Sequence, residues 1–304
     1  MLENFEQLST TFDNCISLDK IIINERIGSG ISSVVYRGNY NGVDIILKKF
    51  DSIHCENESD IISDLTAELN NYKQIQNLNQ CCELIGYSFS NFNKSYQTYL
   101  LLKDYETDGD LYDFIKNDKH WSHYMGIVSR GEYYYEFRHT EWVYKMDRKL
   151  KLEIIVSMCE AIKELHSRNM VHCDIKPNNM IYDQNKNKVI LIDFGISRFI
   201  REHKVIITEE DMGTMGYMCE ELEFGLCSKK SDIYSLGICI LEIWTGEIWG
   251  NGVNYKECRN EAIRRIRYLE ETEKQLGALI RKCILKTVAK RPYIKTVLKS
   301  LKNI

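Results

Sequence analysis

Apolar and polar residues alternate along residues 21–50, and glycine-bearing breaks at 28–30, 38 and 42 interrupt the alternation. A period of two predicts half-buried β-strands, and glycine breaks between such runs predict antiparallel hairpins. The short apolar run at residues 98–105 predicts one more buried strand that ends in a turn. The first part of the chain therefore predicts an antiparallel sheet.

Helical spacing of apolar residues replaces this alternation in most of the remaining chain. One apolar stripe follows residues 60–76, and another follows residues 149–167. Residues 232–246 are apolar nearly all round, which is typical of a helix buried at the centre of a domain. Two further amphipathic helices are expected at residues 273–286 and 292–303. The pattern predicts an α+β fold, with a strand-rich N-terminal lobe that holds one main helix and a mostly helical C-terminal lobe.

Two segments stand outside this pattern. Residues 1–20 are polar and irregular and are interpreted as an N-terminal extension, so that residues 21–304 form the folded domain. Residues 116–148 are dense in aromatic and charged side chains. They form either a surface insertion packed by its own rings or a docking surface for a partner protein, because exposed Tyr, Trp and Arg clusters favour interfaces. Both interpretations stay open.

Composition narrows the class of protein. The formal net charge of -4 gives no basic footprint, so nucleic acid is not expected as a partner. The 11 cysteines contain no C-x-x-C and the 7 histidines no H-x-x-x-H, so no structural zinc site is expected. The chain opens without a cationic segment followed by an apolar run, and no apolar stretch is long enough to span a membrane. These features predict a reduced, cytoplasmic protein, or one in the host cytoplasm if the chain is of viral or intracellular-pathogen origin.

Two features of the predicted sheet suit a nucleotide. The glycine turn at residues 28–30 follows a strand and is followed by Val35. Glycines let backbone N–H groups approach phosphate oxygens, although an ordinary hairpin turn is the alternative. Lys48 ends an apolar strand; such a lysine is usually solvated, whereas a buried one needs a carboxylate partner. Glu68 in the next predicted helix is a candidate for that partner.

The segment "HCDIKPNN" at residues 172–179 carries the strongest chemical signal. It contains Asp174, Lys176 and Asn179, and Asp193 follows at the end of an apolar strand in "LIDFG". Two carboxylates, a lysine and an amide at these offsets suit phosphoryl transfer. One carboxylate accepts the proton of a substrate hydroxyl, and the other, with the amide, holds Mg²⁺ against the nucleotide phosphates.

From about residue 21 to residue 303 the chain resembles a eukaryotic-type protein kinase. The resemblance rests on "GSGISSVV", "IILK", "KDYETDGDL", "HCDIKPNN", "DFG", "GTMGYMCEE", "DIYSLG" and "KRP". It implies the bilobal protein-kinase fold, with an N-lobe at 21–103, a hinge at 104–109 and a C-lobe at 110–304. The insertion at about 116–148 then belongs to the C-lobe.

The resemblance also implies ATP and Mg²⁺ as cofactors and a role for each candidate residue. Lys48, held by Glu68, is expected to orient the nucleotide phosphates. Asp174 is expected to act as the base, and Lys176 to steady the transferred phosphate. The expected metal ligands are Asn179 and Asp193, and the expected nucleotide contacts are Ile27, Gly28, Ser29, Gly30, Val35, Ile46, Lys48, Lys103, Asp104, Tyr105, Asn179 and Asp193.

Lys176 and Thr214 favour a serine/threonine kinase over a tyrosine kinase in this family. The runs "LIGYSF" and "SDIYSLGICILEIWTG" resemble the tyrosine-kinase-like group, which phosphorylates Ser and Thr. In the family, the glutamate that corresponds to Glu221 closes the activation segment and pairs with an arginine, here Arg291. The same pair is therefore expected in this chain.

Five positions depart from the family pattern. Lys103 falls at the gatekeeper position behind the adenine, where an uncharged side chain is usual. A buried ammonium there needs a partner, and Glu68 or Asp193 is expected to supply it. The departures are Ser33 for a loop glycine, Ile46 for a small alanine, Lys103 at the gatekeeper, Glu220 for a proline, and Cys173 for an arginine.

Cys173 bears on control of the activity. In the family the arginine at this position contacts a phosphorylated residue of the activation loop and does no chemistry itself. The acidic residues 209–211 beside Thr208 would repel a phosphate added there. Cys173 therefore predicts a kinase that is active without activation-loop phosphorylation. The alternative is that Arg198 or Arg201 receives the phosphate.

The sequence thus predicts an active, ATP-dependent serine/threonine protein kinase with protein substrates and, through the 116–148 insertion, a signalling partner. One alternative is a pseudokinase that works as a decoy or scaffold. Ser33, Ile46 and Lys103 favour that alternative, whereas the complete set of lysine, carboxylate and amide residues opposes it. A small-molecule kinase of the same fold is a further alternative, which "GTMGYM" opposes because it resembles a peptide-docking loop.

Overall fold

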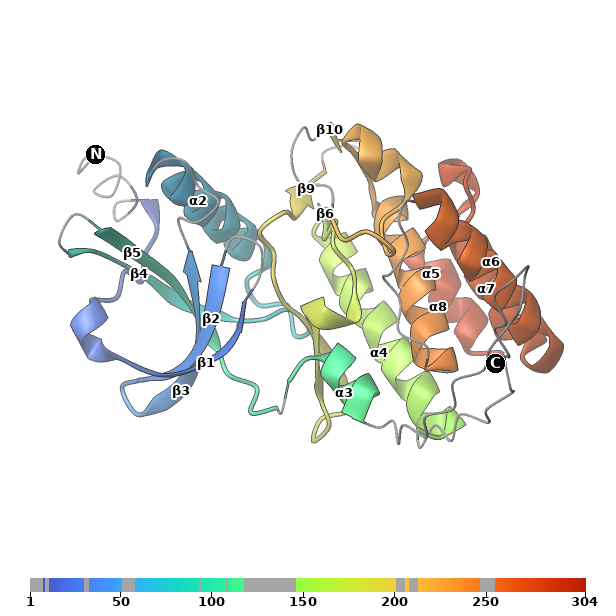
Figure 1. Cartoon of the computed structure of the whole chain (residues 1–304), viewed down its shortest axis with the longest axis horizontal. Coiled ribbons are helices and arrows are strands. Elements are labelled where there is room, and N and C mark those ends of the chain that lie inside the picture. Colours follow the sequence, from blue (N-terminus) through green and yellow to red (C-terminus); the bar gives the residue numbers. More distant parts are fainter. Residues whose placement is uncertain are drawn as a thin grey trace, which may run out of the picture.

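Two lobes make up the protein, a sheet with one main helix and a bundle of helices (Figure 1). A cleft of about 790 Å³ lies between them and is lined by residues of both lobes. The predicted bilobal α+β fold is confirmed. The structure, a computed structural model, describes residues 8, 11–29, 33–50, 58–92, 95–107, 109–117, 146–200, 206–207, 213–246 and 255–304.

The N-terminal lobe is one antiparallel sheet with helix α2 (Glu58–Ile75) packed against it. Side chains alternate across the third strand of this sheet. Ile45 and Leu47 point into a small apolar cluster, whereas Ile46 and Lys48 line the cleft. The strands are β1 (Ile21–Ser29), β2 (Ser33–Tyr40), β3 (Val43–Phe50), β4 (Leu84–Phe92) and β5 (Ser95–Lys103), in the spatial order β1-β2-β3-β5-β4.

Helix α5 (Lys229–Thr245) lies at the centre of the C-terminal lobe, with nearly every side chain buried. Ser228 caps its first turn, and Gly246, at a φ of 70°, ends it. The buried helix predicted at 232–246 is therefore confirmed. Around it lie α3 (Leu111–Asn117), α4 (Arg148–Ser167), α6 (Tyr255–Thr272), α7 (Lys274–Cys283), α8 (Ile294–Leu301) and the 3₁₀ turns Pro177–Asn179, Glu220–Phe224 and Val288–Lys290.

Three short antiparallel strand pairs belong to the described part of the C-terminal lobe. The pairs are β6 (Met170–Val171) with β9 (Arg198–Phe199), β7 (Met180–Asp183) with β8 (Lys188–Leu191), and β10 (Ile206–Ile207) with β11 (Leu226–Cys227). The sequence pattern did not predict helix α6, since most of its surface is charged and only a few apolar residues, such as Ile266 and Leu269, are buried.

Part of the N-terminal segment, expected to be an irregular extension, packs on the first lobe. Leu8 and Phe12 are buried in the same apolar cluster as the core residues of α2. Tyr87 of β4 donates its hydroxyl to the Phe12 carbonyl at 3.2 Å, and the two rings meet edge to face with centroids 6.5 Å apart. Tyr87 also exchanges backbone hydrogen bonds with Asn14 and Ile16. Leu8 and residues 11–17 therefore cover the junction of β4 and α2, and the 3₁₀ turn Leu18–Lys20 follows them.

Two expectations fall on parts of the chain that the structure does not describe. Most of the predicted insertion, residues 118–145, lies outside the described residues, so both interpretations of it stay predictions. Thr208 and the acidic residues 209–211 lie outside them as well. Among the helices that are described, none is both long and apolar enough to cross a membrane.

Candidate active site

A lysine and two carboxylates meet at the back of the cleft. The Nζ of Lys48 on β3 lies 2.8 Å from Oε2 of Glu68 on α2 and 2.7 Å from Oδ1 of Asp193, which follows β8. Glu68 is only 1% exposed, whereas the side chain of Asp193 is 47% exposed toward the cleft. The structure thus brings together the three residues that the sequence placed 20 and 145 positions apart.

These contacts change the affinity of each group for protons. Burial alone would lower the pKa of Lys48, but the charges of Asp193 and Glu68 outweigh it and raise that pKa. The charge of Lys48 lowers the pKa of Asp193 to about 2. Burial raises the pKa of Glu68 to about 6, against the opposing effect of Lys48. Lys48 and Asp193 are therefore charged at neutral pH, and Glu68 is the one of the three whose pKa lies closest to neutral pH.

The catalytic-loop candidates converge on the carboxylate of Asp174. Its Oδ1 accepts the backbone N–H of Thr214 at 2.9 Å, and its Oδ2 accepts the carboxamide N–H of Asn179 at 2.8 Å. Lys176 Nζ lies 2.7 Å from the same Oδ2 and donates to Thr214 Oγ1 at 2.6 Å. Asp174 is thus fixed in orientation by groups from both the loop and the activation segment.

A buried carboxylate on α5, which the sequence analysis did not single out, anchors this loop. Asp232 accepts the backbone N–H groups of His172 at 2.9 Å and Cys173 at 3.0 Å. Its Oδ2 also lies 2.8 Å from Nε2 of His166 at the end of α4. An aspartate in a helix that is apolar nearly all round needs buried partners, and that was the available signal.

Contacts among three rings, one edge to face and one tilted, join the two lobes behind the cleft. Phe194, next to Asp193, meets Tyr72 of α2 and His172 of the catalytic loop, each with centroids 5.3 Å apart. Asn71 of α2 adds two hydrogen bonds, to the carbonyls of Phe194 at 2.7 Å and Ser197 at 3.0 Å. The position of α2, and with it Glu68, is therefore coupled to the position of Asp193.

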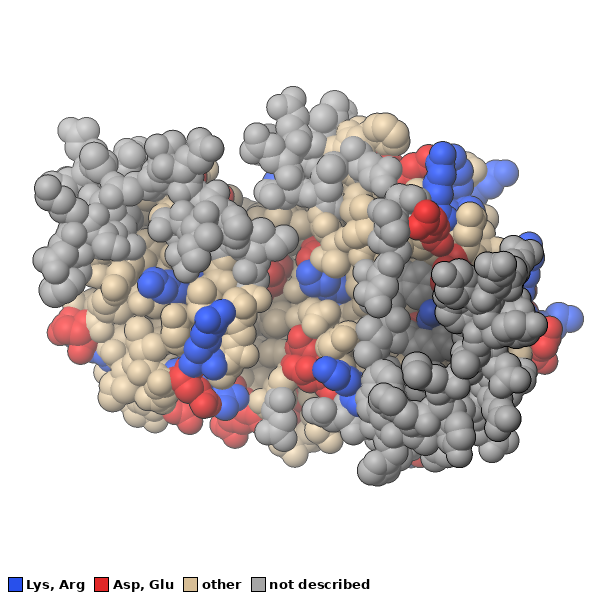
Figure 2. Space-filling view, in the orientation of Figure 1, with Lys and Arg blue, Asp and Glu red and all other residues tan. Residues whose placement is uncertain are grey.

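The predicted nucleotide contacts mostly line the cleft, which Figure 2 shows as a hollow bordered by charges of both signs. Tyr105 is an exception: it does not line the cleft, and its hydroxyl accepts the backbone N–H of Glu83 at 3.3 Å. Gly30 lies outside the described residues. The predicted contacts that line the cleft are Ile27, Gly28, Ser29, Val35, Ile46, Lys48, Lys103, Asp104, Asn179 and Asp193.

The expectation that Lys103 is buried behind the adenine is wrong. Lys103 borders the cleft, but its side chain is 49% exposed and pairs with Glu83 at 3.3 Å. Leu102, which lies opposite Ile46 in the β3–β5 register, is buried and faces the cleft in its place. Because side chains alternate along a strand, a register one residue away from the expected one turns Lys103 outward.

Arg37, also not singled out from the sequence, closes the outer edge of the cleft. Its Nε donates to Oδ2 of Asp104 at 3.0 Å, and its guanidinium reaches the Thr107 carbonyl at 3.4 Å. Strand β2 is thereby attached to the segment that links the lobes.

The predicted pair at the end of the activation segment is present. Arg291 is 1% exposed and contacts both carboxylate oxygens of Glu221, with NH2 to Oε2 at 3.0 Å. Its remaining N–H groups reach the carbonyls of Leu285 and Lys230. This buried pair ties the activation segment to the C-terminal lobe.

Comparison with known proteins agrees with this geometry. Residues 21–301 match the family described as protein kinase domain, and the chain belongs to that family. It is 26% identical over 305 residues, 98% of this chain and 16% of the relative, to a protein of Acanthamoeba polyphaga mimivirus named as a serine/threonine-protein kinase/receptor. It is 33% identical over 149 residues, 46% of this chain, to 23% of the serine/threonine-protein kinase PknB of Mycolicibacterium smegmatis. The chain spans between 15% and 40% of the length of the first curated relatives it matches.

Proposed function

We propose that the chain is an active serine/threonine protein kinase that transfers the γ-phosphate of ATP to protein hydroxyls. The observation that carries this proposal is the contact of Lys48 with both Glu68 and Asp193, beside an Asp174 carboxylate oriented by Thr214. A protein that only bound partners would not need these costly buried charges so closely matched. Protein substrates and a cytoplasmic location belong to the same proposal.

The donor set of the cleft suits ATP with Mg²⁺. Asp193 and Asn179 present a carboxylate and a carboxamide to the cleft, and hard divalent cations prefer such oxygen ligands. When bound, Mg²⁺ would neutralise charge that develops on the phosphates. Lys48, charged and fixed by its two partners, would orient the phosphates of the nucleotide.

Asp174 is the group best placed to receive the proton of the substrate hydroxyl. Its side chain is only 12% exposed and its carboxylate is bonded to Asn179 and Thr214, so its orientation is set before the substrate arrives. Lys176 lies beside it and would carry positive charge toward the transferred phosphate. The hydrogen bond from Lys176 to Thr214 supports serine/threonine specificity, because those two residues carry that feature of the family resemblance.

Activity without activation-loop phosphorylation is part of the proposal. Cys173 offers no cation to a phosphate, and the backbone of the catalytic loop is held by Asp232 instead. The Lys48–Glu68 pair and the edge-to-face contact of Tyr72 with Phe194 join the lobes through side chains of the chain itself. These observations support a loop whose arrangement does not depend on an added charge.

The test begins with nucleotide binding. Thermal denaturation should show a higher Tm with ATP and Mg²⁺ than with ATP alone, and Asp193→Asn should remove that difference. In a transfer assay with serine- and tyrosine-containing peptides, Asp174→Asn should lower the rate by roughly 10²–10⁴ while still binding ATP. If the wild type neither binds ATP nor transfers phosphate with any divalent metal, the pseudokinase alternative holds.

A further inference from the structure

Two cysteine thiols meet between the catalytic loop and the end of the activation segment. The Sγ of Cys173 lies 2.7 Å from the Sγ of Cys227, which is the last residue of β11. Both side chains are buried, with Cys173 4% exposed and Cys227 fully enclosed. A disulfide bond is about 2.05 Å long, so the two sulfur atoms need only a small approach to bond.

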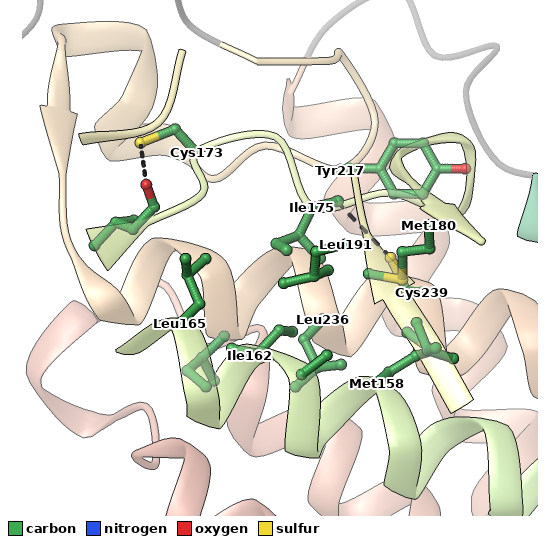
Figure 3. Close-up of a cluster of buried hydrophobic side chains, with 14 of the residues drawn as sticks. Met158, Ile162, Leu165, Cys173, Ile175, Met180, Leu191, Tyr217, Leu236 and Cys239 are labelled. Atoms are coloured by element: carbon green, nitrogen blue, oxygen red, sulfur yellow. Dashed lines mark hydrogen bonds between the residues drawn. The ribbon is translucent and has the colours of Figure 1, made fainter. Parts of the chain in front are cut away.

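The surroundings fix both partners in place. The backbone N–H of Cys173 is held by Asp232 at 3.0 Å, and its Sγ also faces the Val171 carbonyl at 3.8 Å (Figure 3). Cys227 is paired with Ile206 in the β10–β11 ladder. The next residue, Ser228, caps helix α5. The sulfur contact thus lies between two well-anchored backbones, so the two thiols are held beside each other.

We propose that Cys173 and Cys227 form an oxidation site, in which a peroxide converts the two thiols to a disulfide. One thiolate attacks a peroxide oxygen, the O–O bond breaks, and a sulfenic acid and water form. The second thiol attacks the sulfenic sulfur, the S–O bond breaks, and a second water leaves. In total, two thiols are oxidised and one hydrogen peroxide is reduced to two waters.

The disulfide would hold the catalytic loop in the conformation seen in the structure. The two sulfur atoms already touch in the conformation that pairs Lys48 with Glu68 and bonds Asp174 to Thr214. A covalent link from the residue before Asp174 to β11 joins the catalytic loop to the segment that follows the activation loop. Resting on the proposed function, the disulfide would stabilise the active conformation in the way a phosphate–arginine contact does where arginine is present.

Both the oxidation of the two thiols and the reduction of the disulfide are expected to be slow. The hydrogen bond to Cys227, together with burial, raises the pKa of the Cys173 thiol well above its usual value. Because the thiolate is the nucleophile, a protonated and enclosed thiol reacts more slowly than an exposed one. The same enclosure slows the attack of reductants on the disulfide, so that its reduction takes prolonged treatment.

Peptide mapping of the oxidised full-length chain tests the site. The protein is treated with hydrogen peroxide, its remaining thiols are alkylated, and it is digested without reductant. We expect a Cys173–Cys227 linked peptide, two hydrogens lighter than the sum of its parts, and a Tm several degrees higher that dithiothreitol reverses. Cys227→Ser and Cys227→Ala should each abolish both effects, whereas Cys239→Ser, another buried thiol, should leave them intact.

Clear results would overturn the proposal. One is the absence of the linked peptide after the exposed Cys15 has been oxidised. Another is a linked peptide with no change in Tm, or with a transfer rate at least tenfold lower. The peptide and the Tm do not require catalysis, so a chain that bound no ATP would refute the proposed function and leave the oxidation site standing.

Discussion

Replacing Asp232 by asparagine removes a charge and one acceptor from beneath the catalytic loop. The two carboxylate oxygens of Asp232 accept the N–H groups of His172 and Cys173 and contact His166. Asparagine keeps one oxygen and turns its own N–H₂ group toward a former donor, so at least one buried N–H loses its partner. A hydrogen bond to a charged group contributes about 1.5–3 kcal/mol, and we expect the free energy of unfolding to fall by that amount.

Thermal denaturation and steady-state kinetics would measure the two consequences. A loss of this size lowers Tm by roughly 2–5 °C in a domain of about this length. The rate kcat should fall, because Asp174 follows directly after the loosened backbone and transfer is sensitive to its position. The KM for ATP should change little, since Asp232 does not line the cleft.

A matched control lies one turn further along α5. Ser235 is equally buried, but its hydroxyl donates to the Ser231 carbonyl at 3.3 Å within the same helix. Ser235→Ala should therefore leave kcat unchanged. Wild-type Tm and kcat in Asp232→Asn, or an equal loss of kcat in the serine variant, would refute the role given to Asp232.

Three further expectations address other parts of the site. The KM for ATP should rise as pH falls through about 6. Glu68, with its pKa raised to about 6, loses its charge there and releases Lys48. The buried charge of Glu68 lowers the stability of the folded state above that pH, and protonation relieves this cost below it. A pH profile of KM with no step near 6 in the wild type, or with the same step in Glu68→Gln, contradicts this. Lys103→Ala should change the KM for ATP by no more than about twofold, because the exposed ion pair of Lys103 with Glu83 contributes little free energy. A tenfold change in that KM would instead place the Lys103 ammonium at the nucleotide. Thr208→Ala should keep most of the transfer rate; a drop of about tenfold or more, matched by phosphatase treatment, would favour phosphate binding by Arg198 or Arg201.

The sequence predicted those site residues whose partners follow from the resemblance to the kinase family. Lys48 with Glu68 and Glu221 with Arg291 are paired as expected. Asp174 is fixed together with Asn179, its neighbour in the same loop. The pair of Lys48 and Glu68 also follows from the residues themselves, because a buried lysine is unfavourable without a carboxylate partner.

The positions that were missed depend on register and on distant contacts. Lys103 turns outward because Leu102, and not Lys103, lies opposite Ile46 in the β3–β5 ladder, which alternation in β5 alone does not reveal. Asp232 finds its partners 59 to 66 residues away, in segments that meet only in the folded lobe. The spacing of residues along a chain carries no signal for contacts of that kind.

The packing of Leu8 and Phe12 shows that the folded unit includes residues that precede the match to the kinase family. Family similarity begins at residue 21, yet these two side chains fill apolar space beside the helix that carries Glu68. Gly86 permits the fit, since a Cβ there would lie 2.5 Å from the Asn14 carbonyl oxygen. A chain that began at residue 21 would expose that apolar surface to water and would lose packing that holds α2 in place. A partner that binds or displaces Leu8 and Phe12 would therefore move α2 and change the contact between Lys48 and Glu68, without touching the cleft.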